Sequence, residues 1–268
     1  MSLHHFFLDD QVLADEADEV FPLRLSADDR KHAKVLRLAA GEHVSVVDAA
    51  RDYFECEIVQ VEGGDIRARI SQRLDMEQTG PDVILVQGIA KGEKMDDVIR
   101  HATEVGVAAF IPMASSRCVV KLDEKKAASR VARWRAIAKS AAMQSGRLTV
   151  PEVGEPMSVK QVAEALLGAT CVLVCWEECP ATSTIADAIA RGMAECAMGD
   201  RRDARIAVVV GPEGGLSADE VDILTSGPRS WPVTLGPTIL RTETAGVVAP
   251  ALVLYECGGM GAKGSEEK

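Results

Sequence analysis

Several features are missing from this 268-residue chain, and each absence narrows the class of protein. No stretch reaches the roughly 18 to 20 apolar residues that a membrane-spanning helix needs. The first ten residues contain no basic segment followed by an apolar core, so we expect no signal peptide. The seven cysteines lack the spacing of a metal site, and two of them, Cys171 and Cys175, fall in an apolar run. These absences predict a protein of the reducing cytoplasm without a bound metal or a membrane partner.

Two common nucleotide-binding signatures are also lacking. The run Gly259 to Gly264 matches the dinucleotide pattern G-x-G-x-x-G, but only four residues follow it, too few for the helix that the pattern requires. No glycine-rich loop is followed by the Lys-Ser/Thr pair of a P-loop. An ordinary dehydrogenase or kinase is therefore disfavoured.

Positive charge is scarce overall but concentrated in one stretch. The net charge is −11, which disfavours a general nucleic-acid coat protein. Residues 91 to 147, however, carry 12 Lys and Arg against 6 Asp and Glu, a local net charge of +6. This distribution is typical of one localised polyanion site, although a solvated helix face would give the same pattern.

The chain divides into two regions by its hydrophobic pattern. Residues 1–74 predict short strands at 43–48, 53–59 and 66–70, a hairpin turn at 63–65 and one helix at 28–38, which together favour a small β-barrel. Residues 75–81 are polar and end in Gly-Pro, as a linker does. We expect a second domain over 80–258 and a disordered tail over 259–268.

In the second region, apolar strands alternate with helices. Strands are predicted at 83–86, 109–113, 171–175, 206–210 and 233–235. Helices are predicted from Met95 to Val105 and at 125–145, 183–195, 217–226 and 243–256. Buried strands separated by helices indicate a parallel sheet covered on both faces. Ligands of such sheets bind beyond the carboxyl ends of the strands.

Two glycine- and proline-rich loops follow strands of this sheet and precede helices. The first is Gly211-Pro212-Glu213-Gly214-Gly215, after which Ser217 and Glu220 have the spacing of a capping box. The second runs from Leu235 to Arg241, and Thr242 or Thr244 is a candidate N-cap of the next helix. Glycine allows a backbone to approach a ligand closely, so paired loops predict a cofactor pocket built from peptide groups. A purely structural turn, and a surface ion pair between Arg241 and Glu243, are the alternatives.

Several longer motifs occur in a fixed order along the chain. They are HAKVLR from His32, GEKM from Gly92, E-x-GV from Glu104, SRCVVKLD from Ser116, QSGR from Gln144, VGPEGGLSADE from Val210 and LGPTILRTETA from Leu235. With these motifs the chain resembles the ribosomal RNA small-subunit methyltransferase E family of the SPOUT class over nearly its whole length. One departure is Ser145, where some members carry cysteine.

The resemblance implies an α/β fold with a SPOUT-type parallel sheet, a C-terminal trefoil knot and a PUA-like N-terminal barrel that binds RNA. It implies a homodimer that transfers a methyl group from S-adenosylmethionine to N3 of a uridine in 16S ribosomal RNA, either free or in the small subunit. Methylation of another RNA, or a catalytically silent RNA-binding module, are the alternatives.

Roles for individual residues follow from these motifs. Arg241 is expected to stabilise the uracil anion and Glu243 is a candidate base, with an ion-pair or capping role as the alternative. Trp176 is expected either to stack on adenine or to pack in the core. The expected cofactor-binding residues are Trp176, Glu177, Val210, Gly211, Pro212, Glu213, Gly214, Leu235, Gly236, Ile239, Leu240, Arg241, Thr244 and Ala245. The expected RNA-binding residues are Arg37, Lys91, Lys94, Arg117, Lys121 and Arg147.

Overall fold

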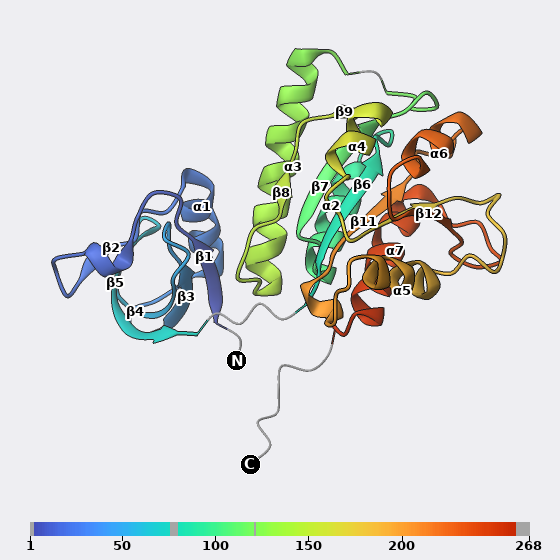
Figure 1. Cartoon of the computed structure of the whole chain (residues 1–268). Coiled ribbons are helices and arrows are strands. Elements are labelled where there is room, and N and C mark those ends of the chain that lie inside the picture. The colour runs from blue at the N-terminus through green and yellow to red at the C-terminus, as the bar shows by residue number, and fades with distance from the viewer. Residues whose placement is uncertain (1–2, 76–79, 121, 261–268) are drawn as a thin grey trace. The chain divides into compact units, whose positions relative to one another are not determined.

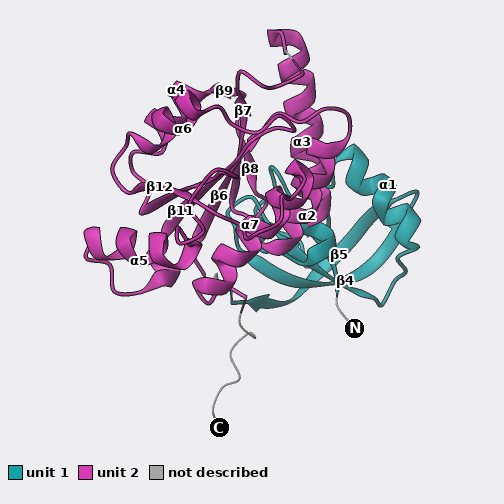
Figure 2. Cartoon of the chain, turned by 90° about the vertical axis from the view of Figure 1, so that its right-hand side faces the viewer, with its two compact units in different colours: residues 1–78, 142–148 teal, residues 79–141, 149–268 magenta. Residues whose placement is uncertain are grey.

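A computed structural model describes residues 3–75, 80–120 and 122–260 of the chain (Figure 1). It divides into two compact units. The described residues of 1–78 and 142–148 form one unit, and those of 79–141 and 149–268 form the other (Figure 2). The linker expected at 75–81 and the tail expected at 259–268 fall largely outside the described residues, as does Lys121.

In its described residues, the first unit contains a five-stranded sheet, helix α1 and the last residues of the helix that ends at Ser145. The strands are β1 (His4–Phe7), β2 (Phe21–Pro22), β3 (His43–Val47), β4 (Tyr53–Glu62) and β5 (Asp65–Leu74), in the order β1-β3-β4-β5-β2. β1 and β3 pair in parallel, and the other strand pairs of this sheet given for the described residues are antiparallel. Helix α1 (Ala27–Leu36) starts at Ser26, whose side chain accepts a hydrogen bond from the Asp29 backbone. Figure 1 shows the sheet strongly curved around its core.

Alternating side chains explain the core of this unit. Phe54, Cys56 and Ile58 on β4 are buried while the residues between them are partly exposed, as expected when one face of a strand is covered. Gly63 and Gly64 connect β4 to β5 with positive φ angles of 59° and 97°, which glycine adopts without strain. The hairpin predicted at this position is therefore confirmed.

The second unit contains an all-parallel sheet. Its strands are β6 (Asp82–Gly88), β7 (Ala109–Ala114), β8 (Glu152–Val153), β9 (Met157–Ser158), β10 (Cys171–Cys175), β11 (Arg205–Val210) and β12 (Ser230–Val233). The order is β12-β10-β11-β6-β7-β8, and β9 also pairs with β7. The predicted parallel sheet is thus present, and the central strand β11 lies between β10 and β6.

Helices cover both faces of this sheet. One face packs against α2 (Lys94–Val105), α3 (Glu124–Ser145), α5 (Ile185–Glu195) and α7 (Thr242–Glu256). The other face packs against α4 (Val159–Ala165) and α6 (Ala218–Thr225) (Figure 2). Side chains of β6 alternate between the two cores: Val83 and Leu85 point to the first, and Ile84 and Val86 to the second. Both faces are therefore apolar, which explains the continuous apolar runs in the sequence.

Differences from the predicted elements are small. The strand predicted at 233–235 is β12 at Ser230–Val233, and it contains Pro232. Proline is tolerated there because β12 is an edge strand. Strand β1, the two-residue strands β2, β8 and β9 and the short helix α4 are not predicted, because they are too short to show a clear period. In the described parts of the chain, no helix is long and apolar enough to cross a membrane.

Candidate functional site

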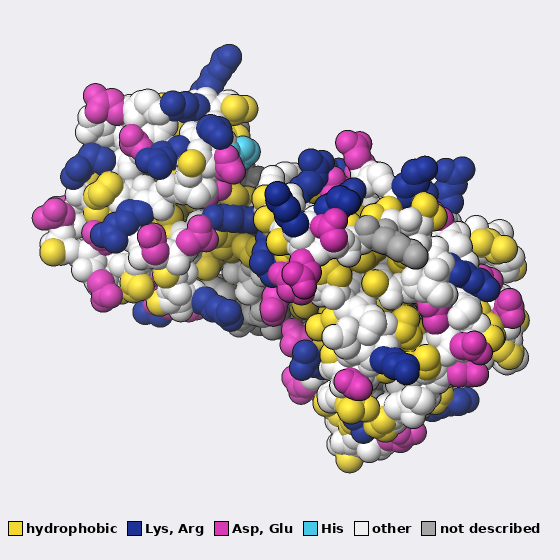
Figure 3. All heavy atoms as spheres, turned by 90° about the horizontal axis from the view of Figure 1, so that it is seen from above, with side chains coloured by type: hydrophobic (Ala, Val, Ile, Leu, Met, Phe, Trp, Pro, Cys, Tyr) yellow, Lys and Arg dark blue, Asp and Glu magenta, His cyan; other side chains and the backbone are white. Residues whose placement is uncertain are grey.

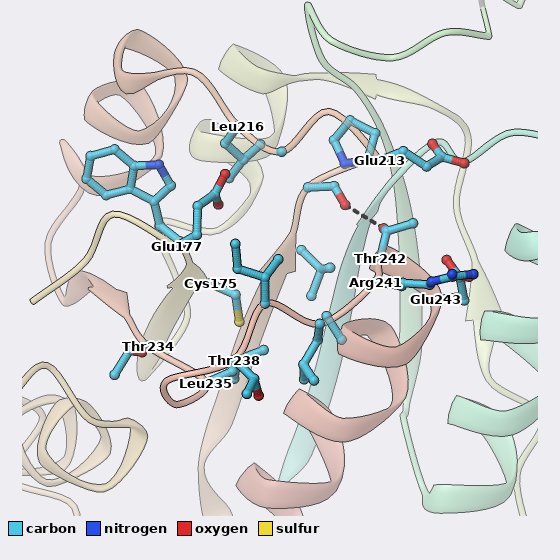
Figure 4. Close-up of a pocket in the computed structure, with 18 of the residues that line it drawn as sticks. Cys175, Glu177, Glu213, Leu216, Thr234, Leu235, Thr238, Arg241, Thr242 and Glu243 are labelled. Atoms are coloured by element: carbon cyan, nitrogen blue, oxygen red, sulfur yellow. Dashed lines mark hydrogen bonds between the residues drawn. The ribbon is translucent and has the colours of Figure 1, made fainter. Parts of the chain in front are cut away.

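A pocket of about 450 Å³ lies at the carboxyl ends of β10 and β11, where the sheet was expected to bind a ligand (Figure 4). Three segments form it: residues 175–177 at the end of β10, residues 210–216 except Gly214 at the end of β11, and residues 234–245 except Thr244, which run from β12 into α7. Lys94 on α2 completes the lining. The two glycine-rich loops therefore lie on the same pocket, as the sequence predicted.

The first glycine loop, residues 211–217, is packed directly on the sheet. A Cβ at Gly88, the last residue of β6, would lie 2.4 Å from the backbone nitrogen of Pro212. A Cβ at Gly211 would lie 2.9 Å from the carbonyl carbon of Gly215, so the loop folds back on itself. The predicted capping box is present, with Ser217 and Glu220 bonded to each other's backbone. Glycine is required here by close approach.

A buried network fixes this loop to α7. The Thr242 hydroxyl donates to the carbonyl oxygen of Gly211 at 2.6 Å (dashed line in Figure 4). The Gln87 side-chain amide on β6 donates to the Thr242 hydroxyl at 2.8 Å. Both side chains are buried. Sequence reasoning did not single out Gln87, although a lone polar residue at the end of an apolar strand is a usable signal, because buried polar groups need partners.

The start of α7 corrects one prediction. The N-cap is Arg241, which makes no side-chain capping bond, and neither Thr242 nor Thr244 is the cap. Thr242 is instead the first helical residue, and its hydroxyl points inward to Gly211. The Arg241 side chain remains exposed and lines the pocket.

Charged side chains gather at one end of the pocket. The Lys94 ammonium lies 3.2 Å from Glu213 Oε1 and 3.4 Å from Glu243 Oε2. The hydrogen bond to Glu213, above all, raises the pKa of Lys94. Burial would raise the pKa of Glu213, but hydrogen bonds from backbone groups, including Lys91 N–H, and from Lys94 outweigh it and lower the pKa. The ion pair considered for Glu243 is therefore made with Lys94, not with Arg241.

The second glycine loop is far more open. Gly236 has a φ of +112°, and a Cβ there would meet nothing within 4 Å. Pro237 and Thr238 are exposed, and Ile239 is 86% exposed although it is a large apolar residue. The main hydrogen bond within this loop runs from Gly236 N–H to the Thr234 hydroxyl oxygen, at 3.1 Å. This loop therefore offers apolar surface and unfilled space to the pocket.

Twelve of the fourteen residues predicted to bind the cofactor line this pocket. The other two, Gly214 and Thr244, do not line it. Trp176 lines the pocket and also packs, partly buried, against the core, so its expected core packing is confirmed and its stacking on adenine stays a prediction. The lining residues not assigned to the cofactor beforehand are Lys94, Cys175, Gly215, Leu216, Thr234, Pro237, Thr238, Thr242 and Glu243.

The residues predicted to bind RNA fall into the two units. Arg37, the exposed C-cap of α1, and the half-buried Arg147 belong to the first unit. Burial lowers the pKa of Arg147 to about 10. Lys91, Lys94 and Arg117 belong to the second unit, where Lys91 and Arg117 are exposed.

Several basic side chains of residues 91–147 are engaged in ion pairs. Arg100 bonds to Asp97, Arg133 to Asp96 and Arg135 to Glu155. On the face shown in Figure 3, Lys and Arg side chains are interspersed with Asp and Glu. The local excess of positive charge thus partly reflects solvated, ion-paired helix surfaces. Among the residues that the structure describes, no group of three His, Cys, Asp or Glu could hold a metal ion.

Comparison with known proteins agrees with this geometry. A family model described as an RNA methyltransferase domain matches residues 77–254. A ribosomal RNA small subunit methyltransferase E from Mycobacterium bovis is 38% identical over 221 residues, which are 81% of this chain and 79% of that protein. The chain belongs to the ribosomal RNA small subunit methyltransferase E family.

Solved structures extend the likeness over almost the whole chain. The methyltransferase E from Neisseria gonorrhoeae, bound to S-adenosyl methionine, has a TM-score of 0.77 and 27% identity, covering 93% of this chain and 96% of that one. A putative methyltransferase from Legionella pneumophila in complex with the same cofactor has a TM-score of 0.78 and 27% identity, covering 94% and 97%. The mixed α/β fold with a parallel sheet is thus shared with methyltransferase E relatives.

Proposed function

We propose that this protein methylates N3 of a uridine in 16S ribosomal RNA, with S-adenosylmethionine as the methyl donor. The observation that carries the proposal is the peptide-lined pocket between the two glycine loops, in a member of the methyltransferase E family. Two structures similar to this one are bound to S-adenosylmethionine.

The residues of the pocket fit this cofactor. Three carboxylates, Glu177, Glu213 and Glu243, and two cations, Lys94 and Arg241, line it, which leaves a net negative charge. S-adenosylmethionine carries a net positive charge and supplies an electrophilic methyl group on its sulfonium when bound. The open space at Gly236 and the exposed Ile239 provide a peptide and an apolar surface for adenosine.

We assign the grip on the cofactor mainly to backbone groups. Val210 to Pro212, and Leu235, Gly236, Ile239 to Arg241 and Ala245, line the pocket from two sides, and we propose that their peptide groups contact the cofactor. Trp176 and Glu177 close the third side. Gly214 does not line the pocket, so its proposed role is to shape the loop. Thr244 is exposed on α7. We propose that it belongs to the cofactor site only as part of the RTETA motif, without lining the pocket itself.

Arg241 and Glu243 are the proposed catalytic residues. Uracil N3 becomes a nucleophile only when its proton leaves, and negative charge then develops on the two uracil oxygens. The exposed Arg241 guanidinium can bind these oxygens and stabilise the charge. Glu243 is the proposed proton acceptor, and Lys94 at 3.4 Å holds its carboxylate in place. Figure 4 shows both residues at the start of α7.

RNA binding is assigned to basic side chains in both units. Lys91, Lys94 and Arg117 belong to the methyltransferase unit, and Arg37 and Arg147 to the first unit; Lys121 remains a prediction outside the described residues. Phosphate contacts position an RNA without reading its sequence. Replacing Lys91 and Arg37 by alanine should lower the slope of log affinity against log salt by about 1.4 to 1.8.

We further propose that the carboxyl-terminal half is a trefoil knot. After β12, the chain passes the loop between β10 and α5, where Thr234 N–H donates to Ser183 O at 3.0 Å. It then reaches the end of β11, where Thr242 bonds Gly211. The segment after β12 thus passes from one side of β10 to the other beside the loop between β10 and α5. A trefoil knot requires that a segment of the chain be threaded through such a loop.

The remaining proposals concern assembly. The curved five-stranded sheet of the first unit supports a PUA-like barrel. Helix α7 is apolar on nearly all sides, and Leu252 and Tyr255 stay 43% and 75% exposed in the single chain, which supports a homodimer through this helix. We also propose a cytoplasmic location for this protein, as the place where its proposed substrate is assembled into small subunits.

A methyl-transfer assay tests the proposed function. Small subunits from cells that lack this protein are incubated with labelled S-adenosylmethionine and either the wild type or Arg241→Ala. We expect Arg241→Ala to lower kcat by about 10²- to 10³-fold, as removal of a stabilising donor does. Its cofactor affinity, measured separately by calorimetry, should change little. The matched control is Arg202→Ala, because Arg202 is exposed and bonds Asp200 outside the pocket.

The position of the label distinguishes the alternatives. Methylation of uridine N3 in the small-subunit RNA supports the proposal. Methylation of a different RNA would assign the protein another target. If the wild type binds the cofactor but transfers no methyl group, the result would favour a catalytically silent RNA-binding module. Wild-type turnover by Arg241→Ala would remove Arg241 from the chemistry.

A further inference from the structure

Residues Ser115 to Cys118 form a turn, here called the strap, that leaves the carboxyl end of β7 and contacts the first glycine loop. The Arg117 guanidinium donates through Nη1 to the carbonyl oxygens of Gly214, at 3.0 Å, and Leu216, at 3.2 Å. Ser116 N–H donates to Glu220 Oε1 at 2.6 Å. These bonds join residues about a hundred positions apart in the sequence, so they hold two separate segments together.

The strap is itself fixed at its base. The Cys118 backbone N–H donates to Ser115 O at 3.2 Å, which closes the turn. Ser115 N–H points at the Cys118 sulfur at 3.4 Å, and that sulfur lies 3.6 Å from Met113 O at the end of β7. Cys118 is only 9% exposed. Arg117 therefore extends from a hydrogen-bonded turn at the carboxyl end of β7.

The two carbonyls held by Arg117 flank the most adaptable residue of the loop. Gly215 lies between them with a φ of +67°, and glycine loses more conformational freedom than any other residue when it is ordered. Gly215 and Leu216 line the pocket, whereas Gly214 and Arg117 do not. Arg117 thus holds the loop from outside the pocket.

The carboxylate of Glu220 holds the same loop from its other end. It accepts bonds from Ser116 N–H and, at 3.0 Å through Oε2, from Ser217 N–H. Burial would raise the pKa of Glu220, but these hydrogen bonds outweigh it and lower the pKa, so the group is ionised where it binds. Arg117 and Glu220 together bracket residues 214–217.

We propose that Arg117 is a positioning residue for the cofactor loop. By holding the carbonyls on both sides of Gly215, it keeps the pocket-lining peptide groups in the geometry that binds S-adenosylmethionine before the cofactor arrives. Preorganisation of this kind raises affinity because less freedom is lost on binding. The inference rests on the proposed function, and it gives Arg117 a role other than a simple phosphate contact.

Arg117→Lys separates the two roles. Lysine keeps the positive charge that a phosphate contact needs, but its ammonium is strongly hydrated and sits on a flexible stem, so it does not reproduce the fixed position of Nη1 between the two carbonyls. We expect the dissociation constant for S-adenosylmethionine, measured by calorimetry without RNA, to rise about tenfold in Arg117→Lys and more in Arg117→Ala. The salt slope of RNA binding by Arg117→Lys should equal that of the wild type.

Steady-state kinetics distinguishes positioning from a general loss of folded protein. We expect a higher KM for S-adenosylmethionine in Arg117→Lys, with kcat at saturating cofactor and KM for the small subunit retained. Partial unfolding would instead lower kcat and leave KM unchanged. Arg100→Lys is the control, because Arg100 is exposed on α2 and bonds Asp97.

Wild-type cofactor affinity in Arg117→Lys would overturn the proposal, whatever happens to RNA binding. If the wild type itself binds no S-adenosylmethionine, the proposed function fails instead, and the two failures are thereby distinguished. Should Arg117→Ala fail to fold, Arg117→Lys and Glu220→Gln, which weakens the other end of the bracket, still decide the question.

Discussion

The two glycine loops of the pocket are built in opposite ways. Residues 211–217 are held by four sets of hydrogen bonds: from Thr242 on α7, from Arg117 on the strap, from Lys91 N–H to the Glu213 carboxylate, and within the Ser217–Glu220 capping box. Residues 235–240 make few internal bonds and are mostly exposed. The comparison indicates that one side of the pocket is formed before ligand binding, whereas the other side is completed by the ligand or by a partner.

The largest effect should come from crowding the first loop. A Cβ in Gly88→Ala would overlap Pro212, and overpacking of this kind costs about 1–3 kcal/mol. We therefore expect cofactor affinity to fall by about 10- to 100-fold, measured by calorimetry. Gly236→Ala meets open space, so only its positive φ is penalised, by about 1 kcal/mol. Gly168→Ala, which meets nothing within 4 Å, is the control. Equal losses of cofactor affinity in Gly88→Ala and Gly236→Ala would contradict the difference inferred between the two loops.

Removal of the hydroxyl that joins the first loop to α7 should have the next largest effect. Thr242→Val leaves the Gly211 carbonyl and the Gln87 amide without this partner in a buried site. The free energy of unfolding should fall by about 1–3 kcal/mol in a urea titration. Thr244→Val, at an exposed position on the same helix, should change it by less than about 0.5 kcal/mol. A similar result for both variants would show that the network does not anchor the loop.

Acid should loosen the first loop. The pKa values of Glu213 and Glu220 are lowered from 4.5 in the folded protein. Their contribution to stability is present above pH 4.5 and is lost as the pH falls through the lowered values. Cofactor affinity and the free energy of unfolding should therefore decline together below pH 4.5. Glu220→Gln should remove part of this dependence, and Asp219→Asn, on the exposed face of α6, should not.

The smallest effect is expected at the exposed tip of the second loop. Ile239→Ala should leave the free energy of unfolding within about 0.5 kcal/mol of the wild type, because the side chain is 86% exposed. It should weaken cofactor binding about fivefold, because the ligand then buries less apolar surface. Thermal melts without and with S-adenosylmethionine measure both quantities. A large loss of stability in the free protein would show that this loop is also preformed.

Local patterns predicted much of this arrangement. The apolar stripe of α2 and the inward residues of α3, Val131, Trp134 and Ala138, are buried as the helical period requires. The capping box predicted between Ser217 and Glu220 is confirmed. It could be predicted because it involves only residues that are three positions apart in the sequence. Twelve predicted residues reached the pocket because both loops follow strands whose carboxyl ends share one edge.

Other features had no local signal. The inward turn of Thr242 depends on where Gly211 lies, and 31 residues separate the two. The role of Arg117 could not be predicted from the sequence either. A basic residue in a basic stretch resembles a phosphate contact, and only the structure shows that it bonds the carbonyls of Gly214 and Leu216. The bond from Thr234 N–H to Ser183 O likewise leaves no trace in hydrophobic periodicity.

The sequence alone determined the parallel sheet, its covering helices and the two glycine-rich loops, because periodicity, capping and glycine act over a few neighbouring residues. Only the tertiary structure decided which loop is held and which is free. That distinction depends on hydrogen bonds between segments such as β6, the strap and α7, and such bonds form only after the sheet has brought distant strand ends to one edge.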